Sequence, residues 1–329
     1  MNKNLHLLLL ALVFALVLAA CGGQQTRGNE SNEPAEPEAP TEEVTEEATE
    51  KPTEIKVTHE FGEITVPVNP KKVIVFDMST LETLDKMGVE VTGVPQANIP
   101  EYLAKYNEDS YENVGSLFEL DFEKMAEINP DLIVISGRQQ EQYEELSKLA
   151  PTLYLSIDYN NYVESFKNNM MILGQIFDQE EAMAAELVAI DEAIASLNEK
   201  VSVDKTALVV LANEGNINAY GTGSRFGIIH EEFGITPVDE NIEVSRHGMN
   251  VSFEYVVEKD PDYLFVIDRD LVVTGEPAAQ QTIENELVQN TKAYQNGNIY
   301  YLDPSYWYIS GSGLVSVSEM IKAMEEAIQ

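Results

Sequence analysis

From about residue 55 onward, short runs of β-branched and aliphatic residues alternate with segments whose apolar positions recur every three or four residues. The first pattern is typical of buried strands and the second of amphipathic helices. Their alternation predicts an α/β fold. Strands are predicted at residues 72–77, 131–136, 152–157, 206–212, 263–268 and 299–302. Helices are predicted at residues 81–87, 122–128, 139–149, 226–233 and 314–328.

One helical pattern, from residue 178 to residue 200, stands apart from the others. Its apolar positions alternate in steps of four and three, which gives one stripe on a continuous helix. These positions are Met183, Leu187, Ile190, Ile194 and Leu197. Asp178 and Glu181 resemble a capping pair at its start. We interpret residues 179–200 as a rigid helix that joins two Rossmann-like lobes, residues 55–178 and 201–329. A surface helix within one domain is the alternative.

The N-terminus has the pattern of a lipoprotein signal. Lys3 precedes an apolar run from Leu7 to Ala20, which ends directly before Cys21. The run is shorter than the roughly 20 residues that a bilayer-spanning helix needs. We therefore predict that residues 1–20 are a cleaved signal peptide and that Cys21 becomes the lipidated first residue. The protein is then expected on the outer face of the cell membrane.

Residues 21–54 have the composition of a disordered acidic linker. After Cys21 the stretch contains Pro, Glu, Thr and Asn but no aromatic residue, so it cannot bury enough apolar surface to fold. Like charges along it favour an extended chain. A long tether with its anchor directly on the cell membrane favours a Gram-positive envelope.

The composition excludes several functional classes. Asp and Glu number 57 against 20 Lys and Arg, a formal charge of -37, so nucleic acid is not an expected partner. Cys21 is the only cysteine and histidines number four, so no disulfide, thiolate nucleophile or structural zinc centre is expected. The sequence also has no activated-serine elbow and no H-E-x-x-H motif. We do not expect an enzyme; a tethered surface hydrolase is the alternative from another class.

Two stretches repeat one another at an offset of 131 residues. Residues 122–138 and 253–269 share an initial Phe, two Glu, a Pro-Asp pair and a final Arg. Each reads as a helix, a Pro-Asp turn, a buried strand and an arginine at the end of that strand. Such units recur by chance in α/β proteins, but six identities in register favour two duplicated lobes.

Arginines at these strand ends indicate an anion site. In open α/β sheets the carboxyl ends of the strands line the ligand crevice, so facing lobes would direct Arg138 and Arg269 into one cleft. Arg225 follows the loop 221–224 and precedes a predicted helix, whose N-terminus also favours negative charge. Phe226 stands where a dinucleotide site needs glycine, so we interpret the loop as a turn that positions Arg225. For each arginine alone, a surface salt bridge is the alternative.

On these residues the chain resembles the ferric-siderophore-binding lipoproteins of the class III substrate-binding family, in the catecholate branch that includes petrobactin- and enterobactin-type binders. The similarity covers roughly residues 55–329, and its most distinctive motif is GSRFGIIH at residues 223–230. The resemblance implies a ferric siderophore as ligand, no intrinsic cofactor, and an ABC permease with its ATPase as partner. We also expect a monomer.

The resemblance assigns the binding roles to single residues. The cleft arginines of the family match Arg138, Arg225 and Arg269. The histidine and tyrosine that complete iron coordination match His247 and Tyr308. For His247 alone, a loop histidine without a ligand role is the alternative.

Two further pairs of residues follow from the resemblance and from the sequence around it. The glutamates that dock the two lobes of the family onto the permease match Glu123 and Glu254; solvated glutamates stabilised by a helix dipole are the alternative. Tyr306 and Trp307, next to Tyr308, are expected to form an apolar wall of the ligand site, with core packing as the alternative.

The chemistry of a ferric catecholate suits these residue types. Such a complex is a bulky trianion with flat aromatic faces, and a guanidinium is always charged and also stacks on rings. Ferric iron prefers six hard donors, so a siderophore that offers four leaves two positions for an imidazole and a phenolate. Haem, cobalamin or a hydroxamate complex, bound in the same fold, is the alternative ligand.

Overall fold

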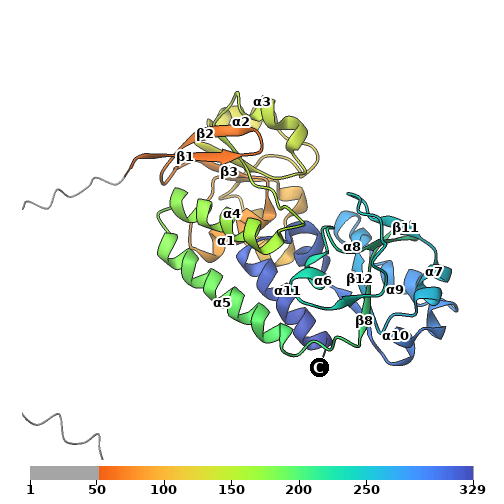
Figure 1. Cartoon of the computed structure of the whole chain (residues 1–329). Coiled ribbons are helices and arrows are strands. Elements are labelled where there is room, and N and C mark those ends of the chain that lie inside the picture. The colour runs from red at the N-terminus through yellow and green to blue at the C-terminus, as the bar shows by residue number, and fades with distance from the viewer. Residues whose placement is uncertain (1–51, 329) are drawn as a thin grey trace, which may run out of the picture. The chain divides into compact units, whose positions relative to one another are not determined.

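The computed structural model describes residues 52–328, so the predicted signal peptide, Cys21 and nearly all of the linker lie outside the described residues. The described chain forms two α/β lobes, each built on its own sheet (Figure 1). Within residues 52–328 no helix combines the length and the apolar character needed to cross a bilayer.

The first lobe, here the N-lobe, contains a five-stranded parallel sheet with the strand order β5-β4-β3-β6-β7 and an antiparallel hairpin, β1-β2. Its strands are β1 (Glu54–His59), β2 (Gly62–Pro67), β3 (Val73–Val75), β4 (Gly93–Val94), β5 (Glu112–Asn113), β6 (Leu132–Ile135) and β7 (Thr152–Tyr154). Its helices are α1 (Met78–Lys86), η1 (Gln96–Asn98), η2 (Glu101–Asn107), α2 (Phe122–Ile128), η3 (Gln140–Gln142), α3 (Tyr143–Leu146) and α4 (Tyr162–Ile176). The central strands β3 and β6 are fully buried, as their unbroken β-branched runs predict.

The second lobe, the C-lobe, contains a mixed six-stranded sheet with the order β11-β9-β8-β12-β13, to which β10 adds beside β8. Its strands are β8 (Thr206–Asn213), β9 (Asn216–Tyr220), β10 (Thr236–Pro237), β11 (Met249–Val251), β12 (Tyr263–Asp268) and β13 (Ile299–Leu302). Its helices are α6 (Ile228–Glu231), α7 (Phe253–Lys259), α8 (Arg269–Val273), α9 (Ala279–Ile283), η4 (Val288–Asn290), α10 (Lys292–Gln295) and the π-helical turn η5 (Ser305–Ser310). β9 and β11 run antiparallel, whereas β8, β10, β12 and β13 are parallel.

The helix that follows the N-lobe and the last helix of the chain pack against each other. α5 (Glu180–Asn198) buries all five residues of the predicted stripe and packs against α4. The helix begins after Gln179, whose side chain makes no capping bond, and the preceding Asp178 adopts a left-handed φ of 56°. The last helix, α11 (Leu314–Ala327), follows the C-lobe sheet but packs against α1 and α5. One hydrophobic cluster therefore runs from the N-lobe strands through α5 and α11 to β12.

The predicted elements agree with the structure where the pattern was strong. All six predicted strands are present, whereas the hairpin β1-β2, the partly polar β9 and β11, and three two-residue strands were not predicted. The predicted helix at 139–149 is shorter, as η3 and α3, and the predicted helix at 226–233 is reduced to α6. α1 begins earlier than predicted because the Asp77 carboxylate accepts a hydrogen bond from Thr80 N and caps the helix.

The internal repeat is present in the structure. α2 and α7 both end in a left-handed residue, Asn129 with φ 50° and Asp260 with φ 45°. In each copy the aspartate after the proline ties its own strand to the start of the neighbouring one. The duplicated units are therefore equivalent from the helix to the start of the strand, whereas at their ends Arg138 lies in a turn after β6 and Arg269 begins α8.

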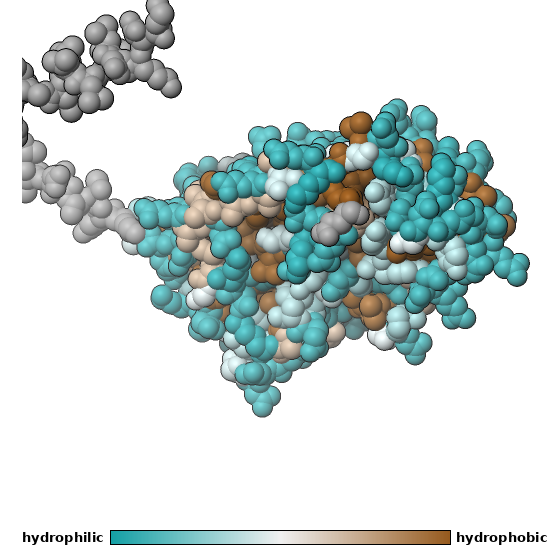
Figure 2. Space-filling view, turned by 90° about the horizontal axis from the view of Figure 1, so that it is seen from below, coloured by the Kyte–Doolittle hydropathy of each residue, from teal (hydrophilic) through white to brown (hydrophobic). Residues whose placement is uncertain are grey.

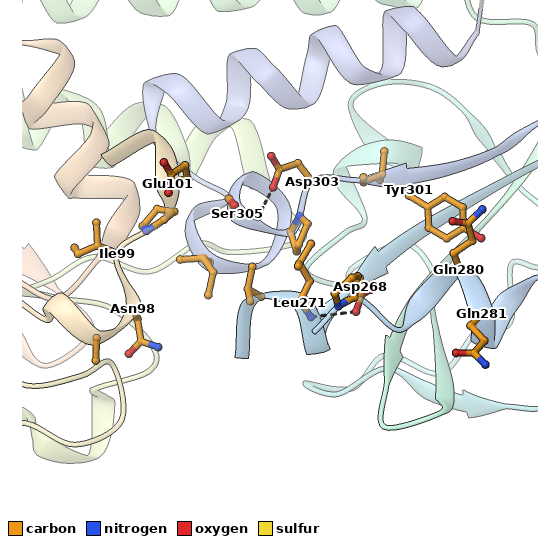
Figure 3. A pocket seen from close by; sticks show the side chains of 17 residues that line it. Asn98, Ile99, Glu101, Asp268, Leu271, Gln280, Gln281, Tyr301, Asp303 and Ser305 are labelled. Carbon is orange, nitrogen blue, oxygen red and sulfur yellow. Dashed lines mark hydrogen bonds between the residues drawn. The ribbon is translucent and has the colours of Figure 1, made fainter. Parts of the chain in front are cut away.

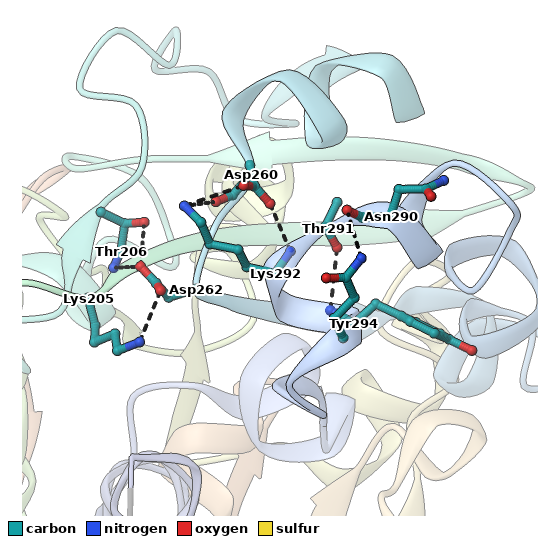
Figure 4. Close-up of polar contacts among 9 residues, drawn as sticks. Lys205, Thr206, Asp260, Asp262, Asn290, Thr291, Lys292 and Tyr294 are labelled. Atoms are coloured by element: carbon teal, nitrogen blue, oxygen red, sulfur yellow. Dashed lines mark hydrogen bonds and ion pairs between the residues drawn. The ribbon is translucent and has the colours of Figure 1, made fainter.

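The aspartates of the two Pro-Asp turns make matching contacts. Lys71 N and Lys72 N donate to Asp131 Oδ2, both at 2.8 Å, at the entry to β3. In the other copy Thr206 N donates to Asp262 Oδ2 at 3.0 Å and Lys205 Nζ to Oδ1 at 3.1 Å, at the entry to β8 (Figure 4). These hydrogen bonds hold in place the strands that lead to Arg138 and Arg269.

Candidate functional site

A cavity of about 830 Å³ lies between the two lobes. The segments that follow β6 and β7 line it from the N-lobe, and the end of β8 and the residue after β12 line it from the C-lobe. It thus occupies the position that ligands take in open α/β sheets, outside the carboxyl ends of the strands.

Every arginine within residues 52–328 lines this cavity, which we name the arginine cavity: Arg138, Arg225, Arg246 and Arg269. The three predicted arginines, Arg138, Arg225 and Arg269, are partly buried. The fourth, Arg246, is exposed. All side-chain ion pairs in this part of the chain use lysines, so none of the four arginines is paired with a carboxylate within 4.0 Å. In so acidic a chain, four unpaired guanidinium groups are available to an anion.

Three of these arginines surround Tyr308. The guanidinium carbons of Arg138, Arg225 and Arg269 lie 5.8, 4.5 and 5.9 Å from the centre of its ring. Arg138 reaches across from the N-lobe and donates to Tyr308 O at 2.5 Å and to Ile309 O at 3.0 Å. Guanidinium groups from both lobes therefore meet at one side chain.

The C-lobe arginines contact the same tyrosine. Arg225 donates to Tyr308 O at 2.9 Å, and Arg269 Nε donates to the Tyr308 hydroxyl oxygen at 3.0 Å. Arg269 is also held by Asn213, whose side-chain oxygen accepts from it at 2.6 Å. The cavity wall is thus ordered before any ligand enters, which lowers the entropic cost of binding.

The electrostatics of the cavity favour an anion. Burial lowers the pKa of Arg138 from its ordinary value, and the nearby positive charge of Arg225 lowers it further. Arginine remains charged despite such a shift, so the like charges are held in place by the fold. One carboxylate, Asp77, also lines the cavity, but it is used in capping, because Thr80 N and Oγ1 both donate to its Oδ2.

His247 lies in an exposed loop between β10 and β11 that borders the cavity. Tyr308 lines the same cavity, so the structure brings the predicted histidine and tyrosine into one site. Within residues 52–328 no group of three or more His, Cys, Asp and Glu residues is placed to hold a metal ion.

The structure does not bring Tyr306 and Trp307 into the arginine cavity. Trp307 is 3% exposed and belongs to the hydrophobic core. Tyr306 packs on Tyr102, with ring centres 4.6 Å apart. The reason is the π-helical turn η5, in which three consecutive aromatic residues face different directions and only Tyr308 lines the cavity.

Glu123 and Glu254 occupy equivalent positions far from this chemistry. Each is the second residue of its helix, α2 or α7, and each is exposed. They therefore present one carboxylate per lobe to the solvent. No contact in the described chain assigns them a further role.

Several cavity residues were not identified from the sequence. Arg246 directly precedes His247, and its rarity in an acidic chain is the signal that marks it. At the cavity border Phe118, Tyr159 and Val244 are 57%, 40% and 60% exposed. These apolar side chains have no periodic pattern around them, so nothing in the sequence distinguishes them from ordinary loop residues.

A second cavity, of about 1030 Å³, is lined in part by residues of η5 (Figure 3). Ile309 lines it, whereas Tyr308 and Ser310 on either side of Ile309 line the arginine cavity. Asn98 and Ile99 border it from the N-lobe and Leu271 from the C-lobe. Its lining contains no lysine or arginine, so it lacks the anion-binding character of the first cavity.

A further face of the molecule is mostly polar. In Figure 2 polar residues cover most of the surface, and hydrophobic residues form separate patches between them. Scattered apolar side chains on a surface are ordinary in folded proteins.

The sequence and the fold of this chain are similar to those of known binding proteins. The family model described as "Periplasmic binding protein" matches residues 73–306. The petrobactin-binding protein YclQ of Bacillus subtilis (strain 168) is 44% identical over 332 residues, covering 99% of each chain. Its crystal structure matches with a TM-score of 0.82 at 46% identity, covering 84% of this chain and 99% of that one. The periplasmic catecholate-siderophore binding protein VctP of Vibrio cholerae matches with a TM-score of 0.77 at 37% identity, covering 83% of this chain and 99% of that one.

Proposed function

We propose that this chain, which belongs to the periplasmic binding protein family, captures a ferric catecholate siderophore in the arginine cavity and delivers it to an ABC importer. The relatives support this ligand class, because YclQ is a petrobactin-binding protein and VctP is a catecholate-siderophore binding protein. Proteins of this family bind and hand over a substrate; they are not enzymes. Haem, cobalamin and hydroxamate complexes are less anionic and would use the cavity less well.

The four unpaired arginines are the observation that carries the proposal. In a chain of charge -37, they gather on one cavity while the lysines pair with surface carboxylates. A ferric catecholate brings three negative charges and flat rings, and guanidinium groups match both properties. The aromatic border residues Phe118 and Tyr159 add apolar surface for the rings.

His247 and Tyr308 would complete the coordination of iron in a tetradentate complex. Both line the cavity, and imidazole and phenolate are suitable donors for ferric iron. Arg269 already donates to the Tyr308 oxygen, and the same bond would stabilise a phenolate bound to iron. A hexadentate siderophore would leave these two residues without a role in coordination.

The remaining assignments concern delivery. Lipidation at Cys21 would hold the protein on the outer face of the membrane, with residues 22–54 as a tether. Glu123 and Glu254, one on each lobe, would contact basic pockets on the two halves of a permease. We propose that the protein acts as a monomer, because one chain supplies both walls of the cavity.

A binding experiment with matched charge changes tests the proposal. Isothermal titration with a ferric catecholate should give a complex with the wild type and about 100-fold or greater loss in R138A/R225A/R269A. A surface triple variant, K56A/K148A/K322A, removes the same charge from exposed ion pairs and should bind normally. If the arginine variant binds as well as the surface variant, the ligand belongs to a less anionic class, and haem, cobalamin and a hydroxamate complex are then titrated in turn.

A further inference from the structure

A buried carboxylate stands behind the wall of the arginine cavity. Glu82, on α1, is 0% exposed, and no lysine or arginine within residues 52–328 lies within 4.0 Å of it in an ion pair. Its Oε1 accepts from Ser316 N at 2.7 Å and Ser316 Oγ at 2.5 Å, at the start of α11. Its Oε2 accepts from the Tyr102 hydroxyl at 2.5 Å. Glu82 thus joins an N-lobe helix to the segment that follows Tyr308.

Tyr102 connects this carboxylate to the cavity. Its hydroxyl oxygen lies 2.6 Å from Ser310 Oγ, and either atom can be the donor in that contact. Ser310 lines the arginine cavity and is two residues beyond Tyr308. A chain of hydrogen bonds therefore runs from Glu82 through Tyr102 to a hydroxyl at the ligand site.

The protonation of Glu82 sets the direction of this chain. When Glu82 is a carboxylate, Tyr102 donates to it, so Ser310 has to donate to Tyr102 and turns only its oxygen lone pairs to the cavity. When Glu82 holds a proton, it can donate to Tyr102, which in turn donates to Ser310. The Ser310 hydrogen is then free to donate to an anion in the cavity.

We propose that Glu82, Tyr102 and Ser310 form a hydrogen-bond relay that links binding of the anionic ligand to uptake of one proton by Glu82. The inference rests on the proposed function, since the arginine cavity is taken to hold a ferric catecholate. Glu82 is in this sense a positioning residue: it acts on the ligand through the orientation of the Ser310 hydroxyl. Protonation favours the donating orientation, so affinity falls as the pH rises.

The surroundings of Glu82 fit a group that titrates in this way. Burial raises its pKa to about 7, and the hydrogen bonds from Ser316, Tyr102 and Ser310 limit the rise. The titratable groups that face it are Tyr102 on η2, Tyr162 on α4 and Tyr306 on η5, with Glu319 of α11 next to Tyr306. None of these is a cation. Burial and the charge of Glu82 raise the pKa of Tyr102 above its ordinary value, so the relay always contains the phenol hydrogen.

The test compares affinity and proton uptake in four proteins: the wild type, E82Q, Y102F and S310A. The probe is the ferric complex of a hexadentate tricatecholate chelator, titrated calorimetrically from about pH 6 to about pH 8.5 in buffers of different ionisation enthalpy. Wild-type affinity should fall by about tenfold more than that of S310A across this range, and the two should converge at the alkaline end. Binding by the wild type should take up more protons than binding by S310A.

E82Q carries an amide that can donate to Tyr102 at every pH, so it should bind with the wild type's acidic-side affinity throughout. Y102F breaks the relay and should lose the extra pH dependence. S310A changes only a small side chain, so it tests the relay even if the variants at the buried positions fail to fold. The protonation of the chelate itself is the same in all four titrations, so the test depends on the differences between the four proteins. Equal pH slopes in all four, with tight binding, would overturn the relay and leave the proposed function standing. Absence of binding by the wild type at every pH would overturn both.

Discussion

The Arg138 guanidinium, at the end of an N-lobe strand, donates to the backbone carbonyl of Tyr308 in the C-lobe at 2.5 Å. The contact spans the cavity and holds both lobes against one aromatic residue. Because Ile309 O accepts a second bond from the same group at 3.0 Å, the geometry requires the forked shape of arginine.

Replacement of Arg138 by lysine should therefore weaken binding although the charge is kept. Lysine offers a point charge and cannot make both carbonyl contacts, so we expect a loss of about 10- to 100-fold for a ferric catecholate, close to that of R138A. Titration calorimetry of the two variants measures this. Retention of full affinity by R138K would show that only charge matters at this position.

His247 and Tyr308 should matter only when iron has open coordination positions. H247A and Y308F should weaken binding of a ferric tetradentate bis-catecholate by about tenfold or more and that of a hexadentate tricatecholate by much less. The ligand-to-metal absorption band of the tetradentate complex should also shift on binding to the wild type and not to Y308F. Equal losses for both chelates would remove the two residues from the coordination sphere.

Arg246 should act mainly on the rate of association. It is exposed at the border of the cavity, where a charge attracts an anion before contact but is well screened by salt. Stopped-flow measurements should show a slower association rate for R246A at low salt, with the difference vanishing at high salt and the dissociation rate nearly unchanged. K148A, which removes an exposed lysine, is the matched control. A large increase in the dissociation rate of R246A would instead indicate a direct contact.

Glu82 should make the fold more stable in acid than at neutral pH. Burial raises its pKa from 4.5 to about 7, so between these values the folded protein keeps a proton that the unfolded chain has lost. The free energy of unfolding should fall by about 3 kcal/mol as the pH rises through that window and stay level above it. E82Q lacks this loss, so its stability relative to the wild type should rise between pH 5 and pH 8 in urea denaturation. The exposed E145Q is the control, and an unchanged difference for E82Q would contradict the prediction.

Gly313 should not tolerate a side chain. A Cβ at this position would overlap Glu82 Oε1 and Ser79 O, neither of which is the free end of a mobile side chain. G313A should lose about 1–3 kcal/mol of stability, measured by thermal unfolding. In the control G137A the added Cβ meets only Tyr154 OH, at 3.9 Å, so little change is expected. A stable G313A would mean that α1 and α11 can separate without cost.

The sequence predicted those features that depend on periodicity and repetition. The strands β6 and β12 contain runs of buried apolar residues, and the matched Pro-Asp turns placed Arg138 and Arg269 shortly after these strands. The orientation of Tyr306, Trp307 and Tyr308 could not be predicted, because a π-helical turn has no sequence period of its own.

Glu82 was missed for a different reason. A glutamate in an amphipathic helix normally faces water, and its burial here depends on α11, more than 200 residues further along the chain, which covers α1. Arg246 was missed because its loop has neither a repeat nor a regular pattern. The burial of Glu82 and the position of Arg246 at the cavity border both depend on how segments distant in sequence come together.

The return of α11 to the N-lobe bears on how the protein reaches its folded state. α1 and α5 share their core with the final helix, so the lobe that is synthesised first cannot complete its packing until the last residues of the chain are present. A chain truncated before residue 314 would expose apolar surface on both helices and should be degraded or aggregate rather than persist as a single folded lobe.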